Sequence, residues 1–227
     1  MNTIHQIMSK NCLRRSLRLI VLYSFCLVIQ NFAMGVVHAE SSSYDDFIFA
    51  VKFDDAATVK SLLQRGIDVN SVETLRGESA LMVAIREKSL KVVDVLLSSP
   101  EIKLEARAQN GDTALMLASY SGNTVVVQKL ITAGAEVNRP GWAAIHYAAA
   151  SGNVETLNLL LDNAAYIDSE SPNKTTPLML AIWSGKYDTA KVLIDAGADI
   201  QLKNDAGMTA KDFAKEVGRN DLISLFK

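Results

Sequence analysis

An apolar pattern recurs from about residue 44 to the end of the chain. Alanine returns with gaps of 34, 34, 30, 33 and 33 residues, at Ala50, Ala84, Ala118, Ala148, Ala181 and Ala214. Twelve residues after each alanine stands a large apolar residue: Leu62, Leu96, Leu130, Leu160, Leu193 and Phe226. A fixed period of this length is the sequence signature of a repeat solenoid. The pattern therefore predicts a stack of similar units, each depending on its neighbours to bury its apolar face.

Polar residues and glycines divide each unit into two short helices. Four units have a good helix N-cap residue before their first apolar segment: Ser79, Thr113, Thr176 and Thr209. Glycine breaks the chain after this segment at Gly122, Gly152, Gly185 and Gly218, where a tight turn favours positive φ. Glycine also follows the second apolar segment in three units, at Gly66, Gly134 and Gly197. Each unit is thus predicted to contain a turn, a short helix, a break and a second helix.

This arrangement resembles the ankyrin repeat, a unit of about 33 residues built from a β-turn and two helices, with the signature T-P-L-H-x-A. The matching stretches are residues 176–181 (TPLMLA), 113–118 (TALMLA) and 79–84 (SALMVA), and residues 145–148 (IHYA) carry the histidine. The resemblance covers residues 44–227. It implies an all-α repeat solenoid, an ankyrin stack of helix-turn-helix units with β-hairpin loops.

The spacing of the columns sets the expected unit boundaries. The units span residues 44–76, 77–110, 111–140, 141–173 and 174–206, and residues 207–227 form a C-terminal cap. In the last unit Lys211 and Asp212 replace the apolar start of the first helix. Because the outer faces of terminal repeats meet solvent, such polar substitutions are expected at the ends of a stack.

Two departures from the ankyrin signature concern the histidine position. Three units carry methionine there, at Met82, Met116 and Met179, and methionine would fill the space by packing. The unit that has His146 carries Ala143 in place of the threonine. We therefore expect this protein to lack the hydrogen bonding that the family builds around the histidine.

Two loops are also expected to differ from the pattern. The 30-residue gap makes the loop at residues 135–140 three residues shorter, which predicts a stunted β-hairpin with Pro140-Gly141 in its turn. Pro100 stands where other units have glycine and cannot adopt positive φ. An altered, slightly longer loop is therefore expected at residues 98–109.

The first 39 residues have the features of a secretory signal peptide. They hold four basic residues and no acidic one, then an apolar run at residues 19–29, and they end in Val37-His38-Ala39. We expect cleavage after Ala39, which leaves residues 40–227 as the mature domain. The alternative is an uncleaved signal anchor that inserts residues 19–37. The leader is bacterial in style and predicts a periplasmic protein, although release outside the cell stays open.

Composition narrows the class of partner. Apolar residues make up 49 % of the chain, enough for a packed core, and charged residues make up 21 %. The chain has 23 basic and 25 acidic residues, and the leader holds Lys10, Arg14, Arg15 and Arg18, so the mature domain is net acidic. An acidic domain is a poor ligand for nucleic acid or for anionic lipid. We expect a monomer that binds neither nucleic acid nor, once the leader is cleaved, a membrane.

The mature domain is poor in histidine and cysteine, two types of side chain that often catalyse reactions or bind metals. Both cysteines, Cys12 and Cys26, lie in the leader, and His146 is the one histidine of the mature domain. This excludes cysteine–histidine nucleophiles and cysteine-based zinc sites there, and no glycine-rich phosphate loop is present. We expect no cofactor, no metal site and no enzymatic activity. A hydrolase with an unrecognised site that uses His146 is the enzyme alternative.

The resemblance implies that partners bind at the loop tips and along the concave face of the first helices. Carried over to this chain, it gives ten candidate partner-binding residues: Arg76, Glu78, Arg86, Asn110, Asp112, Tyr120, Arg139, Trp142, Trp183 and Met208. Tyr120, Trp142 and Trp183 have the side-chain types that are enriched in binding hot spots. Their rings could instead only pack on neighbouring helices.

The functional hypothesis is a periplasmic interaction module that scaffolds, protects or inhibits one or a few exported proteins. A host-directed secreted effector is the alternative within the binding class.

Overall fold

A computed structural model describes residues 43–226, so the expected leader and its cleavage point lie outside the described residues. The chain divides into two units, Met1–Asp46 and Phe47–Lys227, and the repeats belong to the second. No helix within residues 43–226 has the length and apolar character needed to cross a bilayer.

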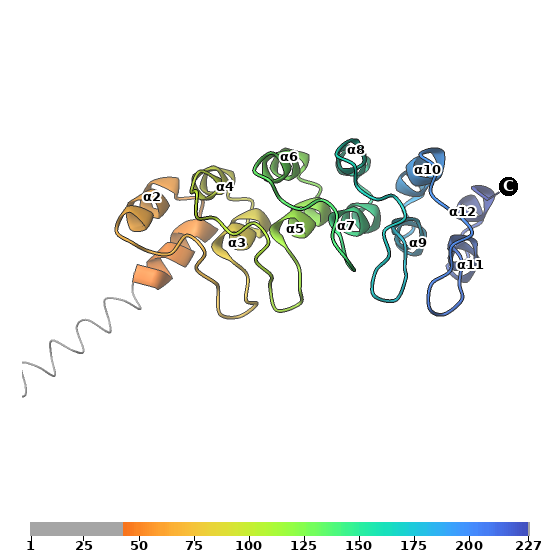
Figure 1. Cartoon of the computed structure of the whole chain (residues 1–227), viewed down its shortest axis with the longest axis horizontal. Helices are drawn as coiled ribbons and strands as arrows, with labels where there is room; N and C mark the ends of the chain where they lie inside the picture. The colour runs from red at the N-terminus through yellow and green to blue at the C-terminus, as the bar shows by residue number, and fades with distance from the viewer. Residues whose placement is uncertain (1–42, 227) are drawn as a thin grey trace, which may run out of the picture. The chain divides into compact units, whose positions relative to one another are not determined.

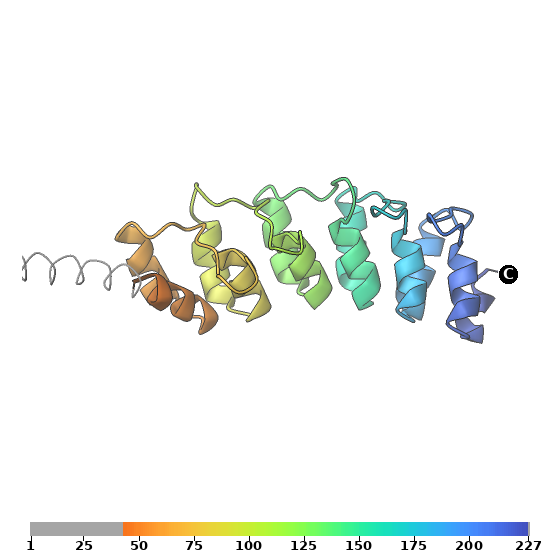
Figure 2. The same ribbon diagram turned by 90° about the horizontal axis from the view of Figure 1, so that it is seen from below.

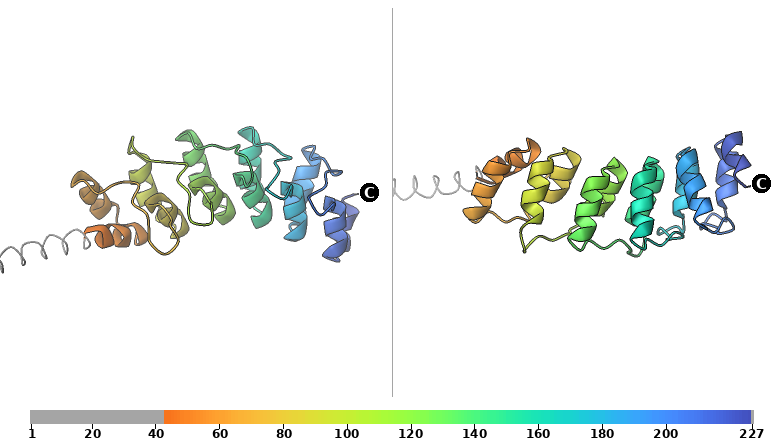
Figure 3. Two further views of the ribbon diagram at one scale, coloured as in Figure 1. Left: turned by 60° about the horizontal axis from the view of Figure 1, so that its bottom comes forward. Right: turned by 90° about the horizontal axis from the view of Figure 1, so that it is seen from above.

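Helices alternate between two rows (Figure 1). The described residues begin with a helical segment at residues 43–52. The outer row then holds α2 (Ala56–Gln64), α4 (Leu90–Leu97), α6 (Thr124–Thr132), α8 (Val154–Asp162), α10 (Tyr187–Asp195) and α12 (Asn220–Ser224). The inner row holds α3 (Ala80–Arg86), α5 (Ala114–Ser121), α7 (Ala144–Ser151), α9 (Pro177–Trp183) and α11 (Ala210–Glu216). Figures 2 and 3 show the successive helix pairs standing side by side along the stack. The predicted repeat solenoid is confirmed.

The two apolar columns form the core between the rows. All six alanines of the first column are buried, which lets neighbouring inner helices such as α5 and α7 approach closely. The five leucines of the second column are also buried. Each fully buried leucine contributes about 1.5–3 kcal/mol relative to an exposed one. At the C-terminal end Phe226 is only partly covered, and Leu222 of α12 is fully buried instead.

The predicted helix caps are present in the structure. Ser79, Thr113, Thr176 and Thr209 each accept a hydrogen bond from the backbone N–H three residues further on. The predicted glycines at the breaks and helix ends all have positive φ. The same backbone geometry recurs at four residues other than glycine, namely Asp54, Lys88, Ala164 and Lys174. Neighbouring repeats therefore impose the left-handed turn even where the local sequence does not favour it.

Five loops project as fingers from the inner-helix side (Figure 1). Four of them close with backbone hydrogen bonds across the tip, such as Ser171 N–H to the Thr175 carbonyl at 3.1 Å and Lys174 N–H to the Ser171 carbonyl at 2.8 Å. The described residues contain no β-strand, and Val72 and Ser79 form an isolated antiparallel bridge. The β-hairpin loops expected from the family pattern are thus short, and a few backbone hydrogen bonds close each of these four fingers.

The finger before α7 is the shortest, as the spacing predicts. Eleven residues separate Thr132 of α6 from Ala144 of α7, whereas fourteen separate Asp162 from Pro177. The expected small hairpin is not formed there, because residues 135–142 run as bends without a backbone bond across the tip. Gly141 does turn the chain with a φ of 80°. The loop between Leu97 and Ala114 is the longest, at sixteen residues, in agreement with the expectation for Pro100.

Candidate binding surface

An aromatic cluster lies beside the short finger. It consists of Tyr120 at the end of α5, Trp142 just before α7, and His146 and Tyr147 on α7. The Trp142 ring meets His146 edge-to-face at 5.3 Å between ring centroids and Tyr147 at 6.5 Å. Tyr120 meets Tyr147 in the same way at 6.4 Å. Edge-to-face contacts are favoured by the charge distribution of aromatic rings, so the cluster is a packed unit.

The aromatic cluster forms the wall of an apolar pocket of about 240 Å³. Its four side chains line the pocket together with Ala150 of α7 and Leu180 of α9. Tyr120 is nevertheless 61 % exposed and Trp142 is 40 % exposed. These two rings therefore both pack on neighbours and present apolar surface to solvent.

A second pocket, of about 180 Å³, adjoins the first. Trp142 and Tyr147 line both pockets, so their rings form the partition. The other lining residues of the second pocket include Arg107, Asn110, Asp112, Arg139 and Pro140. An aromatic-walled pocket and a pocket with charged side chains thus share one wall.

Hydrogen bonds hold the acidic side of the second pocket in place. The Tyr147 hydroxyl donates to the Asp112 carboxylate, and the Asn110 amide donates to the same carboxylate at 2.7 Å. Burial and the bond with Asp112 raise the pKa of Tyr147 well above its usual range, so it stays a donor. Both carboxylate oxygens of Asp112 therefore already accept a hydrogen bond within the protein.

Arg139 is buried without full hydrogen bonding. Its side chain is 8 % exposed, and its Nη1 lies 3.9 Å from Glu105 Oε2, which is too long for a hydrogen bond. Both atoms lack a hydrogen-bond partner in the described structure. A buried polar atom without a partner costs about 1–3 kcal/mol.

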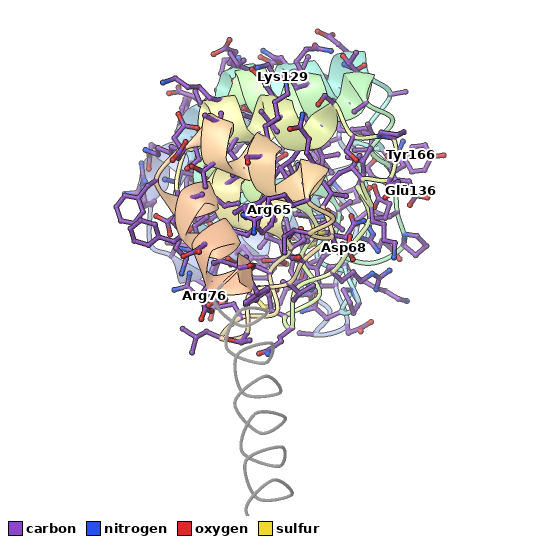
Figure 4. The ribbon with its side chains drawn as sticks, turned by 90° about the vertical axis from the view of Figure 1, so that its left-hand side faces the viewer. Arg65, Asp68, Arg76, Lys129, Glu136 and Tyr166 are labelled. Atoms are coloured by element: carbon purple, nitrogen blue, oxygen red, sulfur yellow. The ribbon has the colours of Figure 1, made fainter. Side chains whose placement is uncertain are left out.

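The remaining candidates lie away from these pockets. Arg86 forms an ion pair with Glu78 at 2.8 Å beside the first finger, and Arg76 belongs to that finger. Trp183, at the end of α9, is 53 % exposed and meets Phe213 edge-to-face at 5.7 Å. Met208 lies in the last finger before α11. Figure 4, viewed from the left-hand side of Figure 1, separates Arg76 on the finger side from Lys129 on the outer helices.

Of the ten candidates, five meet around the pockets: Asn110, Asp112, Tyr120, Arg139 and Trp142. The sequence reasoning did not select Arg107 and Tyr147, although both line the second pocket. Tyr147 stands directly before the alanine column, a position that could have been included with the other inner-helix residues.

His146 has a structural role that differs from the sequence prediction. Its Nδ1 accepts from the Ala143 N–H at 3.1 Å, and its Nε2 lies 3.1 Å and 3.2 Å from the carbonyls of Ser169 and Thr175. The expected loss of hydrogen bonding around this histidine is therefore wrong, because all of its partners are backbone groups, which do not depend on a threonine side chain at position 143. Burial lowers the pKa of His146 and keeps the ring neutral. Met116 and Met179 accept comparable bonds through sulfur at 3.4 Å and 3.5 Å.

The described residues contain no cluster of three or more histidine, cysteine, aspartate or glutamate side chains with metal-binding geometry. Both ring nitrogens of His146 already have backbone partners. The geometry that this surface offers is therefore that of binding pockets.

Curated relatives match the chain over most of its described part. The human transient receptor potential cation channel subfamily A member 1 is 30 % identical over 162 residues, which are 66 % of this chain and 14 % of that protein. The neurogenic locus notch homolog protein 1 of Xenopus tropicalis is 33 % identical over 135 residues, 58 % of this chain and 5 % of that protein. The mitochondrial disaggregase of Bos taurus is 32 % identical over 145 residues, 61 % of this chain and 21 % of that protein. The chain thus spans only a small part of the length of each of these relatives.

Solved structures and family models agree with the fold. The crystal structure of the human ASB11 ankyrin repeat domain superposes with a TM-score of 0.70 at 26 % identity, covering 79 % of this chain and 80 % of that one. The model for ankyrin repeats in three copies matches residues 47–140 and 126–204. With its alanine and leucine columns, paired helices and fingers, this chain belongs to the ankyrin repeat family.

Proposed function

We propose that this protein is a periplasmic interaction module that binds one or a few exported proteins through its inner-helix and finger side. Ankyrin repeats are protein–protein interaction modules. The observation that carries the proposal is the exposure of Tyr120, Trp142 and Trp183 along that side, with an apolar pocket behind the first two. Tyrosine and tryptophan dominate binding hot spots, because a large rigid ring loses little entropy when it is covered.

The proposed action is scaffolding, protection or inhibition of the partner, carried out by a monomer without catalysis. Both ring nitrogens of His146, the one histidine after residue 39, already have backbone partners, which supports a binding role. The periplasmic location is supported by the basic and apolar leader that ends in Ala39.

The location is tested by expressing the full chain with a C-terminal tag in a Gram-negative bacterium. The tagged protein should appear in the periplasmic fraction, and N-terminal sequencing should begin at Glu40. A protein that retains residues 1–39, or that stays in the cytoplasm, would contradict this part of the proposal.

The binding surface is tested by capture from the same fraction. Trp142→Ala with Trp183→Ala should lose the captured partner, while the unfolding curve remains cooperative. Val125→Ala with Tyr166→Ala is the matched control, because both side chains are large and exposed but belong to α6 and to the loop after α8. Equal capture by the two double variants would show that the partner binds elsewhere.

A host-directed effector is the second candidate. Detection of the tagged protein inside host cells, with little of it in the periplasm, would support this candidate over the first.

A further inference from the structure

The two pockets that meet at Trp142 and Tyr147 differ in chemistry, and this difference narrows the class of partner. The inference rests on the proposed function, since it concerns the same surface. It goes further by stating which types of partner side chain this surface would bind.

The apolar pocket has the size of one side chain. Its volume of about 240 Å³ lies below the range of roughly 300–1,000 Å³ that is usual for pockets holding whole small molecules. Its walls are the aromatic cluster, Ala150 and Leu180, with no charged residue among them. A leucine, methionine or phenylalanine side chain of a partner would bury apolar surface there.

The second pocket contains two arginine side chains whose guanidinium groups are not fully hydrogen-bonded within the protein. Arg107 is exposed and forms no ion pair or hydrogen bond with any residue of the described part of the chain. Arg139 is more than nine-tenths buried, and its Nη1 has no hydrogen bond. Asp112, the acidic residue of the pocket, is already bonded to Tyr147 and Asn110. The Arg139 Nη1 lies 3.9 Å from Glu105 Oε2, within ion-pair range but too far for a hydrogen bond. Arg107 and Arg139 therefore both have N–H groups that are free to donate, and a carboxylate is the acceptor that guanidinium groups bind best.

The short finger explains why the two pockets lie next to each other at this unit. Pro140, Gly141 and Trp142 of that finger all line the second pocket, and Trp142 also lines the first. The other fingers have at least three more residues and a closing bond across the tip. The three-residue deletion thus leaves the Trp142 ring partly exposed between a basic and an apolar pocket.

We propose that these paired pockets bind an extended segment of a partner protein that carries an apolar side chain close to an aspartate or glutamate. The apolar side chain enters the pocket behind Tyr120 and Trp142. The carboxylate lies at Arg107 and Arg139. Because Trp142 and Tyr147 line both pockets, the two anchors lie close together in the sequence of the segment.

The probe for the test is a displayed library of random peptides, selected on the purified full-length protein. The recovered peptides should share an apolar residue within a few positions of an acidic residue. Synthetic versions, acetylated and amidated so that no terminal carboxylate remains, should bind at least about tenfold more tightly than versions with the acid replaced by its amide. Replacing the apolar residue by alanine should cost a similar factor.

Variants of the protein assign each anchor to its pocket. Arg107→Gln should reduce the preference for acid over amide severalfold, because only Arg139 then remains at the carboxylate, while leaving the preference for the apolar residue intact. Because Arg107 is exposed, this variant is expected to fold. Ala150→Leu should fill the apolar pocket and weaken every recovered peptide. Tyr166→Ala, on the loop after α8, is the matched control and should bind as the wild type does.

Several outcomes overturn the inference. They are the recovery of no binding peptide, recovery of peptides without an acidic residue, or an acid preference that is undiminished in Arg107→Gln. The proposed function would survive these outcomes if the wild-type protein still captures an exported partner and the variant with both tryptophans replaced does not. Undiminished capture of that partner by the variant with both tryptophans replaced would instead contradict the proposed function.

Discussion

At the scale of single residues, the unit that carries His146 keeps the hydrogen bonds of the histidine but lacks a side-chain cap on α7. Ala143 has no side chain that can cap α7, yet its N–H donates to the His146 ring. In the unit before it, Thr113 caps the helix and the Met116 sulfur accepts the Thr113 N–H. The stability of this unit should therefore respond to changes at both Ala143 and His146.

Ala143→Thr should stabilise the protein by about 1 kcal/mol, the usual contribution of a threonine N-cap. The backbone of Ala143 has φ −126° and ψ 163°, in the extended region like that of the capping residues Thr113 and Thr176. Urea unfolding at neutral pH measures the effect. Thr176→Ala is the matched control and should destabilise by a similar amount. A destabilised Ala143→Thr variant would mean that the pocket around residue 143 has no room for the hydroxyl.

The stability of the stack should depend on the protonation of His146. Burial lowers its pKa below the ordinary 6.5, so the unfolded chain binds a proton before the folded chain does. The stabilisation that neutral His146 contributes is complete above about pH 6.5. It is lost as the pH falls from there towards the lowered pKa of His146 in the folded state. Free energies of unfolding measured between about pH 8 and pH 5 should show this loss.

His146→Met is the matched variant for that measurement, because Met82, Met116 and Met179 occupy the same position in other units. It should be less stable than the wild type at neutral pH, since it loses the bonds to Ser169 and Thr175. It should also lose less stability on acidification. An identical pH dependence in both proteins would show that His146 does not titrate in this range.

At the scale of elements, side chains in the loops after the outer helices join each repeat to the next. Asn138 donates to the Ala164 carbonyl at 2.6 Å and accepts from the Tyr166 N–H at 2.7 Å. Asn70 makes the same two kinds of bond with Glu101 and Lys103. Asp168, at the equivalent place after α8, can only accept, and it does so from the Asp199 N–H at 3.0 Å.

Asp168→Asn should therefore stabilise the protein by about 0.5–1.5 kcal/mol, the net contribution of one added hydrogen bond. Burial, together with repulsion from Asp199, raises the pKa of Asp168, so its charge is unfavourable at neutral pH. The variant removes that charge and adds an N–H donor. Asn138→Asp is the reverse control and should destabilise. An unchanged unfolding midpoint in Asp168→Asn would show that no added bond forms between these repeats.

The helices were more predictable from sequence than the loops were. Alanine and leucine columns and N-cap residues specify the helix pairs, because small and large apolar side chains must alternate between the rows of a stack. The left-handed turns at Lys88 and Ala164 could not be read from residue type, since those residues disfavour positive φ. The short finger was placed correctly, but its hairpin was not formed. A loop three residues shorter leaves no room for a closing bond across its tip.

At the scale of the whole molecule, the candidate surface was predicted in part. Tyr120 and Trp142 were selected from side-chain type and position, and the structure places both beside one pocket. Arg107 and Tyr147 were not selected, because their place at the pocket depends on how one finger lies against the next inner helix. Trp183 was grouped with Trp142, yet it packs on Phe213 and lines neither pocket.

The proposed function requires that an exported partner binds to the inner-helix and finger side of the stack. The most direct measurement is site-specific photo-crosslinking in living cells, with a photoreactive phenylalanine analogue placed in turn at Tyr120, Trp142 and Trp183, and at the exposed outer positions Val125 and Tyr166. We predict that the three inner positions crosslink to the same exported protein and that the two outer positions do not. Crosslinks to that protein from Val125 and Tyr166, with none from the three inner positions, would contradict the account.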